Sequence, residues 1–418
     1  MMFLKIRKRY LFYALALTSS AIASISAGVD VIAIRKYGEV YEEAPLLYGF
    51  SVFLVGFIIT LLFCLIFSIP YKGRSLGSFL DPAFKHLRFV RKEEIAYHLL
   101  AGFGNAITTT GYFFVLTVMP DPSTVLPFYQ TVILYLLLVE VIAEKNAPTL
   151  VEIQSSAIVT FGAILGSLSF KGEIDLSALA IVFLVVNPGW VLLSIYQRKL
   201  KLLKIRGEPN DSLNIRFWNI LFSLAFMIII MLILGQFFKK PLLTIGTESS
   251  INFFWLVSVI ATLAFFSYIF HIRALGIGKA SVTQAVKATT IVFAIPVTFI
   301  LSMFIPIPFP TTPTLWLIRS IGFILVILGI ISFAITQVRA YIFIRAAPGV
   351  RVAKLIEEIW KIKGVDSVSA VSGTYDVIAR VTTRTLLKGY ERIVKRLESI
   401  HGIKEFRWNS ILKEWENV

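Results

Sequence analysis

The chain has 418 residues, of which 57% are hydrophobic, and a mean hydropathy of +0.79. Soluble domains contain only about 45 to 50% apolar residues, so this composition excludes a soluble protein over most of the length. The 41 Lys and Arg against 25 Asp and Glu fit either a nucleic-acid partner or basic loops that orient membrane helices. We expect a lipid bilayer and no nucleic acid, because the basic residues lie between apolar spans. The single cysteine, Cys64, excludes an intrachain disulfide and a thiolate metal cluster.

Ten apolar stretches in residues 1–337 are long enough to cross a bilayer of about 30 Å, at about 1.5 Å per residue. The first is longer than the roughly 7 to 15 residues of a signal-peptide core, so we interpret it as a membrane helix. Proline-rich segments after Met119 and before Leu315 end helices because proline lacks a backbone donor. The predicted spans are Tyr10–Ile34, Leu46–Ile69, Ile95–Met119, Ser123–Ala143, Leu150–Phe170, Leu176–Tyr196, Ile215–Leu234, Phe253–Phe270, Ala280–Ile305 and Leu315–Ile335.

The distribution of Lys and Arg predicts how these spans are oriented. Basic residues gather in the N-terminal segment and in the second, sixth and eighth loops, which all fall on one side of a ten-span bundle. The loops of the opposite side contain few, and the proline-rich segment 306–313 contains none. We therefore expect a multi-pass protein of the cell membrane with both termini in the cytoplasm.

The two halves of the membrane part are alike. The sequence Gly-Ala-Ile-Leu at 162–165 in the fifth span corresponds to Gly-Phe-Ile-Leu at 322–325 in the tenth, 160 residues later. Because each half has an odd number of spans, the halves are inserted with opposite orientations. We predict two inverted five-helix repeats, at about 10–170 and 175–337, with a substrate site near the midplane where they meet.

With ten predicted spans in two repeats, residues 10–337 resemble the EamA type of the drug/metabolite transporter superfamily. The resemblance rests on the ten-span topology, the junction Ala274–Ser281, the later Pro296 and the small-residue faces around Gly162 and Gly322. It implies a transporter built from two five-helix repeats.

Two features depart from that family. No acidic residue follows Pro296 at the family's distance, and the basic residue common near the start of the second helix is missing around Tyr48. The proline-to-glutamate spacing of the fourth helix fits Pro127 with either Glu140 or Glu144. The substrate is therefore not carried over from the family.

Polar side chains within spans cost several kcal/mol unless they are paired or hydrated, so they mark candidate substrate pathways. Each has a structural alternative. The alternative for Asp30 is solvation at the outer interface, and the alternative for Glu140 and Lys287 is a structural ion pair. The sequence Asn187–Gly189 is expected to break the sixth helix, either to free carbonyls for a site or as a lipid-side kink. His271 is expected at the interface. The candidate pathway residues are Asp30, Asn105, Gln130, Glu140, Asn187, Gln284 and Lys287.

After Gln337 the long apolar spans give way to short alternating strands and amphipathic helices. Their order, βαββαβ, predicts an α+β ferredoxin-like domain at 338–418. Two helices cover only one face of a four-stranded sheet, so we expect a homo-oligomer that covers the other face. The predicted elements are Ala340–Arg345, Val350–Lys361, Val365–Val371, Asp376–Thr382, Leu386–Ile400 and Ile403–Leu412. The expected contact residues are Tyr341, Phe343, Phe406 and Trp408.

This tail resembles the ligand-binding half of the Lrp/AsnC regulators (RAM domain) over most of 338–415. The resemblance rests on Ala-Ala-Pro-Gly at 346–349, Lys-Gly-Val at 363–365, Val-Ser-Gly-Thr-Tyr-Asp-Val at 371–377 and His-Gly-Ile at 401–403. It implies pairing through sheets and an amino-acid-like effector. The implied effector-binding residues are Gly373, Tyr375 and Asp376, for which a hairpin turn with a packed tyrosine is the structural alternative. The family's helix-turn-helix has no room between the tenth span and the first strand, so DNA regulation is not expected.

Together these patterns predict a secondary transporter or exporter of a small metabolite, such as an amino acid, regulated by an effector bound to the cytoplasmic C-terminal domain. The alternative is a membrane-embedded small-molecule sensor or receptor without transport. Charged residues in a central cavity favour transport, whereas an apolar cavity favours sensing. The sequence has no P-loop, GxSxG, HExxH or paired-cysteine motif, so we expect no enzyme activity, no catalytic residues, no metal and no cofactor.

Overall fold

The computed structural model divides into two compact units, each with its own hydrophobic core. Over the described residues, the larger unit contains Lys8–Asn146 and Ser156–Ile330, and the smaller contains Ala147–Ser155 and Ile331–Val418. The described residues are 8–118, 129–144, 150–166, 176–205, 207–278, 280–303, 313–335, 338–362, 364–383 and 393–410.

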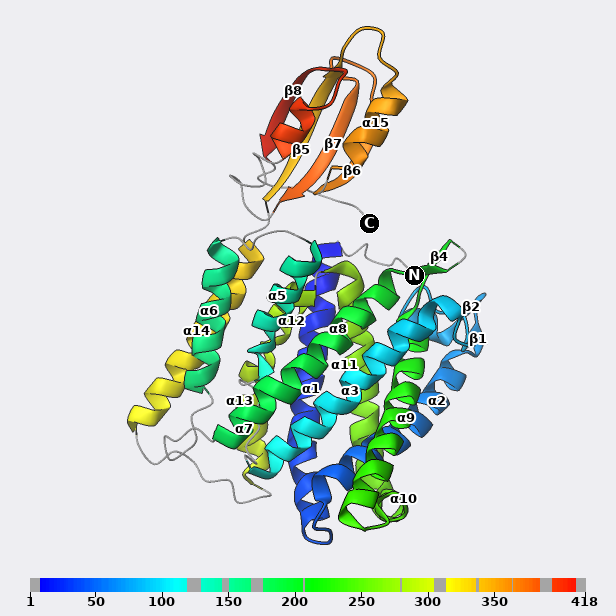
Figure 1. Cartoon of the computed structure of the whole chain (residues 1–418), viewed down its shortest axis with the longest axis vertical. Helices are drawn as coiled ribbons and strands as arrows, with labels where there is room; N and C mark the ends of the chain where they lie inside the picture. The colour runs from blue at the N-terminus through cyan, green and yellow to red at the C-terminus, as the bar shows by residue number, and fades with distance from the viewer. Residues whose placement is uncertain are drawn as a thin grey trace. The chain divides into compact units, whose positions relative to one another are not determined.

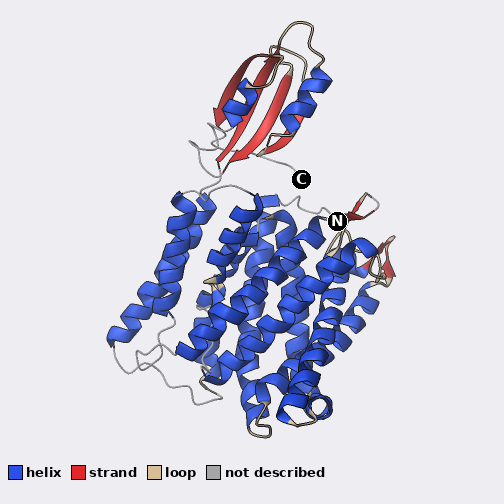
Figure 2. Cartoon of the chain, in the orientation of Figure 1, coloured by secondary structure: helices blue, strands red, loops and turns tan. Residues whose placement is uncertain are grey.

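The larger unit is a bundle of α-helices (Figures 1 and 2). Helices suit its apolar stretches because a helix satisfies its backbone hydrogen bonds internally, which lipid requires. The helices are α1 (Lys8–Gly38), α2 (Ala44–Phe67), α3 (Lys92–Val118), α5 (Val132–Glu144), α6 (Leu150–Gly166), α7 (Leu176–Ile181), η2 (Val182–Val186), α8 (Asn187–Leu202), α9 (Ser212–Phe238), α10 (Leu242–Asn252), α11 (Phe254–Ile277), α12 (Ala280–Lys287), α13 (Thr290–Leu301) and α14 (Pro313–Ile335).

Seven spans in the described residues are long and apolar enough to cross a membrane, which indicates a multi-pass membrane protein. They are Leu11–Gly38, Ala44–Phe67, Lys92–Val118, Leu176–Leu202, Ser212–Phe238, Phe254–Ile277 and Ala280–Leu301. The apolar stretches of α6 and α14, Ile153–Gly166 and Pro313–Gly329, are shorter. Residues 119–128, which include the first six residues of the predicted fourth span, lie outside the described part of the chain. The count of ten spans stays a prediction.

Two helical details differ from the sequence-based expectation. The ninth predicted span is divided into α12 and α13 by a turn at Ala288 and Thr289. Helix α10 lies where a loop was expected, because its polar residues give no span-like hydropathy. Its hydroxyls bond back to its own turn, with Ser249 Oγ and Ser250 Oγ donating to Gly246 O at 2.9 and 2.6 Å.

Helix packing in the bundle joins segments far apart in the sequence. Helix α1 packs on α11, α3 packs on α8 and on α9, and α2 packs on α9 and on α11. Small residues permit close approach, as is common between membrane helices. A Cβ on Gly104 of α3 would lie 2.5 Å from Gly189 O of α8, and a Cβ on Gly162 of α6 would lie 2.7 Å from Gly322 O of α14.

A network of charges ties the loop between α2 and α3 to the loop between α8 and α9. Arg88 donates from both terminal nitrogens to Glu94 at 2.7 Å, and the Asn210 side chain bonds to both partners. Lys201 Nζ lies 2.6 Å from Asp81 Oδ2. These loops carry two short hairpins, β1 (Pro70–Tyr71) with β2 (Arg74–Ser75) and β3 (Lys204–Ile205) with β4 (Glu208–Pro209), and the turn η1 (Leu76–Phe79).

The smaller unit contains an antiparallel four-stranded sheet with the order β6-β7-β5-β8 (Figure 2). Its elements are β5 (Val338–Ala346), α15 (Val352–Trp360), β6 (Val365–Ala370), β7 (Val377–Thr383), a helical segment at 393–398 and β8 (Ile403–Ser410). Part of the predicted second helix, 386–392, lies outside the described residues. The ferredoxin-like assignment therefore stays a prediction.

The strand register corrects the predicted contact face of this sheet. Ile342 lies opposite Trp408, and Ile344 lies opposite Phe406. Directly opposed residues of an antiparallel pair point to the same face, so Phe406 and Trp408 share the face of the buried isoleucines. Both pack against the core of this unit. Their assignment to the free face was wrong because the sequence does not reveal the register of β8 against β5.

Tyr341 and Phe343 do lie on the opposite face. In β5 they alternate with the fully buried Ala340, Ile342 and Ile344, and both are partly exposed. Their rings lie 6.5 Å apart. The free face of the sheet thus carries an aromatic pair on its central strand β5.

Candidate functional site

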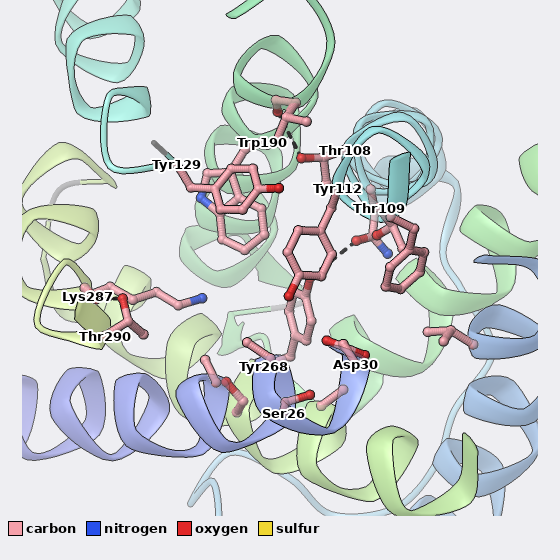
Figure 3. Close-up of a pocket in the computed structure, with 18 of the residues that line it drawn as sticks. Ser26, Asp30, Thr108, Thr109, Tyr112, Tyr129, Trp190, Tyr268, Lys287 and Thr290 are labelled. Atoms are coloured by element: carbon pink, nitrogen blue, oxygen red, sulfur yellow. Dashed lines mark hydrogen bonds between the residues drawn. The ribbon is translucent and has the colours of Figure 1, made fainter. Parts of the chain in front are cut away.

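A cavity of about 200 Å³ lies within the helical bundle of the larger unit (Figure 3). Six of the seven predicted pathway residues line it: Asp30, Asn105, Gln130, Asn187, Gln284 and Lys287. They come from α1, α3, the turn before α5, α8 and α12. The seventh, Glu140, belongs to α5, and its side chain lies outside the described part of the structure.

Asp30 occupies one wall of the cavity. It is only 7% exposed, so the expectation that it is simply solvated at the interface is wrong. Tyr48 Oη donates to Asp30 Oδ1 at 2.5 Å, and the hydroxyl of Tyr112 is a second hydrogen-bond partner. The hydroxyl of Tyr48 thus satisfies one oxygen of the buried carboxylate.

Lys287 faces the cavity from α12 (Figure 3). Its Nζ lies 4.6 Å from the centre of the Trp190 ring and 5.8 Å from that of Tyr268, so aromatic faces stabilise the ammonium. No carboxylate among the described side chains lies within 4.0 Å of this nitrogen. The predicted ion pair with Glu140 stays a prediction.

Two glutamines join the walls of the cavity. Trp190 Nε1 donates to Gln284 Oε1 at 3.1 Å, and Gln284 Nε2 donates to Gln130 Oε1 at 3.3 Å. Gln130 Nε2 in turn donates to Thr290 Oγ1 at 3.3 Å. The chain of bonds fixes the Trp190 ring in the wall and holds α8, α12 and the turn before α5 together.

Asn187 lies on the cavity, but the helix around it is not broken. Residues Val182–Val186 form a π-helical segment that runs directly into α8, so the regular α-helical hydrogen-bond pattern is interrupted before Asn187 while the chain stays helical. A π-turn accommodates Pro188 and leaves carbonyls available, as expected for such insertions. Thr108 Oγ1 donates to Val186 O at 2.8 Å, and Tyr135 Oη donates to Phe183 O at 3.0 Å.

The sequence pattern did not single out Arg216, which also lines the cavity. Its guanidinium carbon lies 4.2 Å from the centre of the Tyr268 ring, whose hydroxyl donates to Asn105 Oδ1 at 3.3 Å. A signal was present, because Arg216, Asn219 and Ser223 recur at helical spacing on one face of α9. The position of Arg216 near a helix end made it resemble a loop residue.

His271 is buried, not interfacial, with 1% of its surface exposed. Neither ring nitrogen has a hydrogen-bond partner in the described structure, and its ring centre lies 6.0 Å from that of Trp190. It therefore belongs to the polar interior behind the cavity wall.

The predicted effector residues of the smaller unit form a turn. Gly373 has a φ of +139°, which favours glycine. Asp376 Oδ2 accepts from Ala346 N at 2.8 Å, and the Tyr375 ring lies 5.4 Å from that of Phe343. These contacts match the structural alternative, a turn with a packed tyrosine, and they place Tyr375 and Asp376 against β5.

Comparison with known families concerns this smaller unit. Residues 339–417 match the family model of the Lrp/AsnC ligand binding domain. The tail carries an Lrp/AsnC ligand-binding domain. This match implies a small-molecule effector for the tail, and it extends over a minor part of the chain, so the resemblance of residues 10–337 to the EamA type stays a prediction.

No curated protein matches the chain. Among solved structures, one described only as the crystal structure of a protein is 12% identical, with a TM-score of 0.46. The alignment covers 78% of this chain and 98% of the other. A similarity at this level supports no inference about function.

Proposed function

We propose that the chain is a secondary transporter or exporter of a small metabolite, such as an amino acid, and has no enzymatic activity. The observation that carries this proposal is the cavity, which gathers Asp30, Arg216 and Lys287 inside a multi-pass bundle. Ionisable side chains at membrane depth are costly and mark substrate or ion pathways. A receptor that only binds an apolar ligand has no need for three such charges.

Helix packing supports the inverted-repeat architecture that many transporters use. In the two predicted repeats, α1 corresponds to α8, α2 to α9 and α3 to α11. If the halves are exchanged, the contact between α1 and α11 becomes the contact between α8 and α3, and both contacts exist. The same exchange converts the contact of α2 with α9 into itself. Gly162 and Gly322, which correspond between the halves, touch each other. Equivalent residues meet only close to a two-fold axis.

We further propose that an amino-acid-like effector bound to the Lrp/AsnC domain regulates transport, with Gly373, Tyr375 and Asp376 at its site. A ligand changes transport only if it favours one arrangement of the protein over another. Both termini are expected in the cytoplasm, where the effector is sensed. Reporter fusions after Gln337 and calorimetric titration with the twenty amino acids check these two expectations.

The experiment that tests transport is a flux screen with the purified full-length chain in proteoliposomes. Amino acids and related metabolites are supplied in turn, and uptake is compared with protein-free liposomes. We expect uptake of at least one solute to exceed the protein-free rate. If none does while an amino acid binds the protein, the chain is a sensor without transport.

A further inference from the structure

Two cations line the cavity. Arg216 from α9 and Lys287 from α12 are 5% and 8% exposed. Both lie over the same ring, with Arg216 Cζ 4.2 Å and Lys287 Nζ 5.8 Å from the centre of Tyr268. Lys287 also lies 4.6 Å from the Trp190 ring. Tyr268 is therefore the aromatic ring that the two positive charges have in common.

Neither cation is neutralised by the described protein. Arg216 Nε and Nη1 are buried without a hydrogen-bond partner, and no described carboxylate lies within 4.0 Å of Arg216 or Lys287. Buried charges without a partner are strongly unfavourable, and aromatic faces compensate only in part. Among the described side chains such a pair is an incomplete site, since an anion is what both cations lack there.

Asp30 is the one carboxylate among the described cavity residues, and it already has partners. Its Oδ1 accepts from Tyr48 at 2.5 Å, and Tyr112 is its second hydrogen-bond partner. Figure 3 shows Asp30 and Lys287 on opposite sides of the view, with the rings of Tyr112 and Tyr268 drawn between them. Asp30 therefore forms no ion pair with Arg216 or Lys287 in the described structure.

From this geometry we propose that Arg216 and Lys287 form the subsite for a carboxylate of the transported molecule. The inference rests on the proposed transport function of the cavity and names its substrate class. The formal charges of the described lining, two positive and one negative, sum to one positive charge. One carboxylate balances that charge, whereas a phosphate dianion leaves an excess of negative charge in a poorly solvated site.

The remaining surface of the cavity fits the body of an organic acid. Aromatic rings of Tyr112, Tyr129, Trp190 and Tyr268 line it together with apolar side chains. Arginine binds a carboxylate in two-pronged geometry, and the lysine ammonium adds a second point of contact. A planar or aliphatic carboxylic acid is thus the expected class of substrate.

The test measures binding to the full-length chain in detergent by calorimetry, without any flux. Three matched pairs are used as probes: benzoate and benzamide, butyrate and butanamide, and L-phenylalanine and L-phenylalaninamide. We expect the carboxylate of at least one pair to bind tenfold or more tightly than its amide. Equal affinity within every pair, or no carboxylate binding at all, overturns the proposal.

Variants assign the preference to the two cations. Arg216→Gln and Lys287→Gln are each expected to weaken binding of the preferred carboxylate at least tenfold and to leave its amide unchanged. Lys199→Gln is the matched control, because Lys199 also lies over an aromatic ring, 4.7 Å from the centre of Tyr196, but does not line the cavity. If Arg216→Gln fails to fold, the proposal is tested with Arg216→Lys and Lys287→Gln instead. Unchanged carboxylate affinity in Lys287→Gln contradicts the proposal.

Failure of this inference is distinct from failure of transport. A solute that is transported with no preference for carboxylates overturns the subsite and leaves the transport function standing. A carboxylate that binds through Arg216 and Lys287 without any flux leaves the subsite standing and overturns the transport function.

Discussion

Asp81 and Asp211 show how single residues respond to their surroundings in the loops that join the helices. Burial alone raises the pKa of Asp81, but the Lys201 ammonium and the Ser212 hydrogen bonds lower it overall. For Asp211, burial outweighs the hydrogen bonds from Asn214 and raises the pKa to about 6. Asp211 caps α9 by accepting from Asn214 N at 2.7 Å. The two carboxylates therefore affect stability in opposite directions as the pH falls.

Replacing Asp211 tests this difference. With a folded pKa of about 6, above the ordinary value of 3.8, the folded state gains a proton more readily than the unfolded state. Stability therefore rises as the pH falls from 7 to 5, by about 1 kcal/mol. The rise is measured as the difference in melting temperature between pH 7 and pH 5. Asp211→Asn, which keeps a good cap, is expected to lose this rise, whereas Asp81→Asn is expected to keep it. An unchanged increase in Asp211→Asn contradicts the assignment.

Six of the 25 residues that line the cavity were predicted from the sequence, because a strongly polar side chain in an apolar span is conspicuous. Asp30, Asn105 and Lys287 were found this way, and the structure places them around one cavity. Arg216 was missed because it stands near a helix end, where arginine is common. Trp190 was missed because an aromatic residue in a membrane span has no compositional signal of its own.

At the scale of elements, glycine contacts determine how closely helices pack. A Cβ on Gly322 would meet the backbone of Gly166 and, at 2.7 Å, Gly162 O, and backbone atoms have little freedom to move aside. Gly322→Ala is expected to cost about 1–3 kcal/mol and to lower the melting temperature. Gly38→Ala is the control, because nothing lies within 4 Å of that position. Equal melting temperatures in the two variants would contradict a close contact between α6 and α14.

The elements themselves were predicted unevenly, for physical reasons. Hydropathy located the long helices, since a continuous run of about 20 apolar residues is typical of a membrane helix. It gave no warning of α10, whose polar composition resembles a loop. Proline at 188 predicted a broken helix, but a π-turn and hydroxyl donors from Thr108 and Tyr135 kept the helix continuous. Such compensation depends on neighbouring helices and is invisible in a local pattern.

The sheet of the smaller unit offers a test of self-association. Phe343 and Tyr341 lie on its free face, whereas Trp408 packs into the core. We expect the full-length chain in detergent to form dimers or larger assemblies by light scattering, and Phe343→Glu to dissociate them, because an unpaired charge at a buried contact is unfavourable. Lys354→Glu, on the exposed side of α15, is expected to leave the assembly intact. A monomeric wild-type chain refutes the expectation.

At the scale of the whole molecule, the chain combines a membrane bundle containing a charged cavity with an Lrp/AsnC ligand-binding domain. The composition and the tail motifs predicted this division, because long apolar spans and short alternating strands have different periodicities. The number of spans depends on segments whose length and composition are intermediate, so hydropathy alone does not decide it. The substrate depends on the geometry of a few side chains that meet only in the folded bundle.

The most direct test of the transport route is counterflow in proteoliposomes loaded with the solute identified by the screen. The wild-type chain is expected to accumulate the labelled solute above protein-free liposomes, and Asp30→Asn, which alters a cavity carboxylate, to reduce the initial rate at least tenfold. Glu39→Gln, an exposed carboxylate near the end of α1, is expected to match the wild type. An Asp30→Asn protein that folds and transports at the wild-type rate would contradict a route through this cavity.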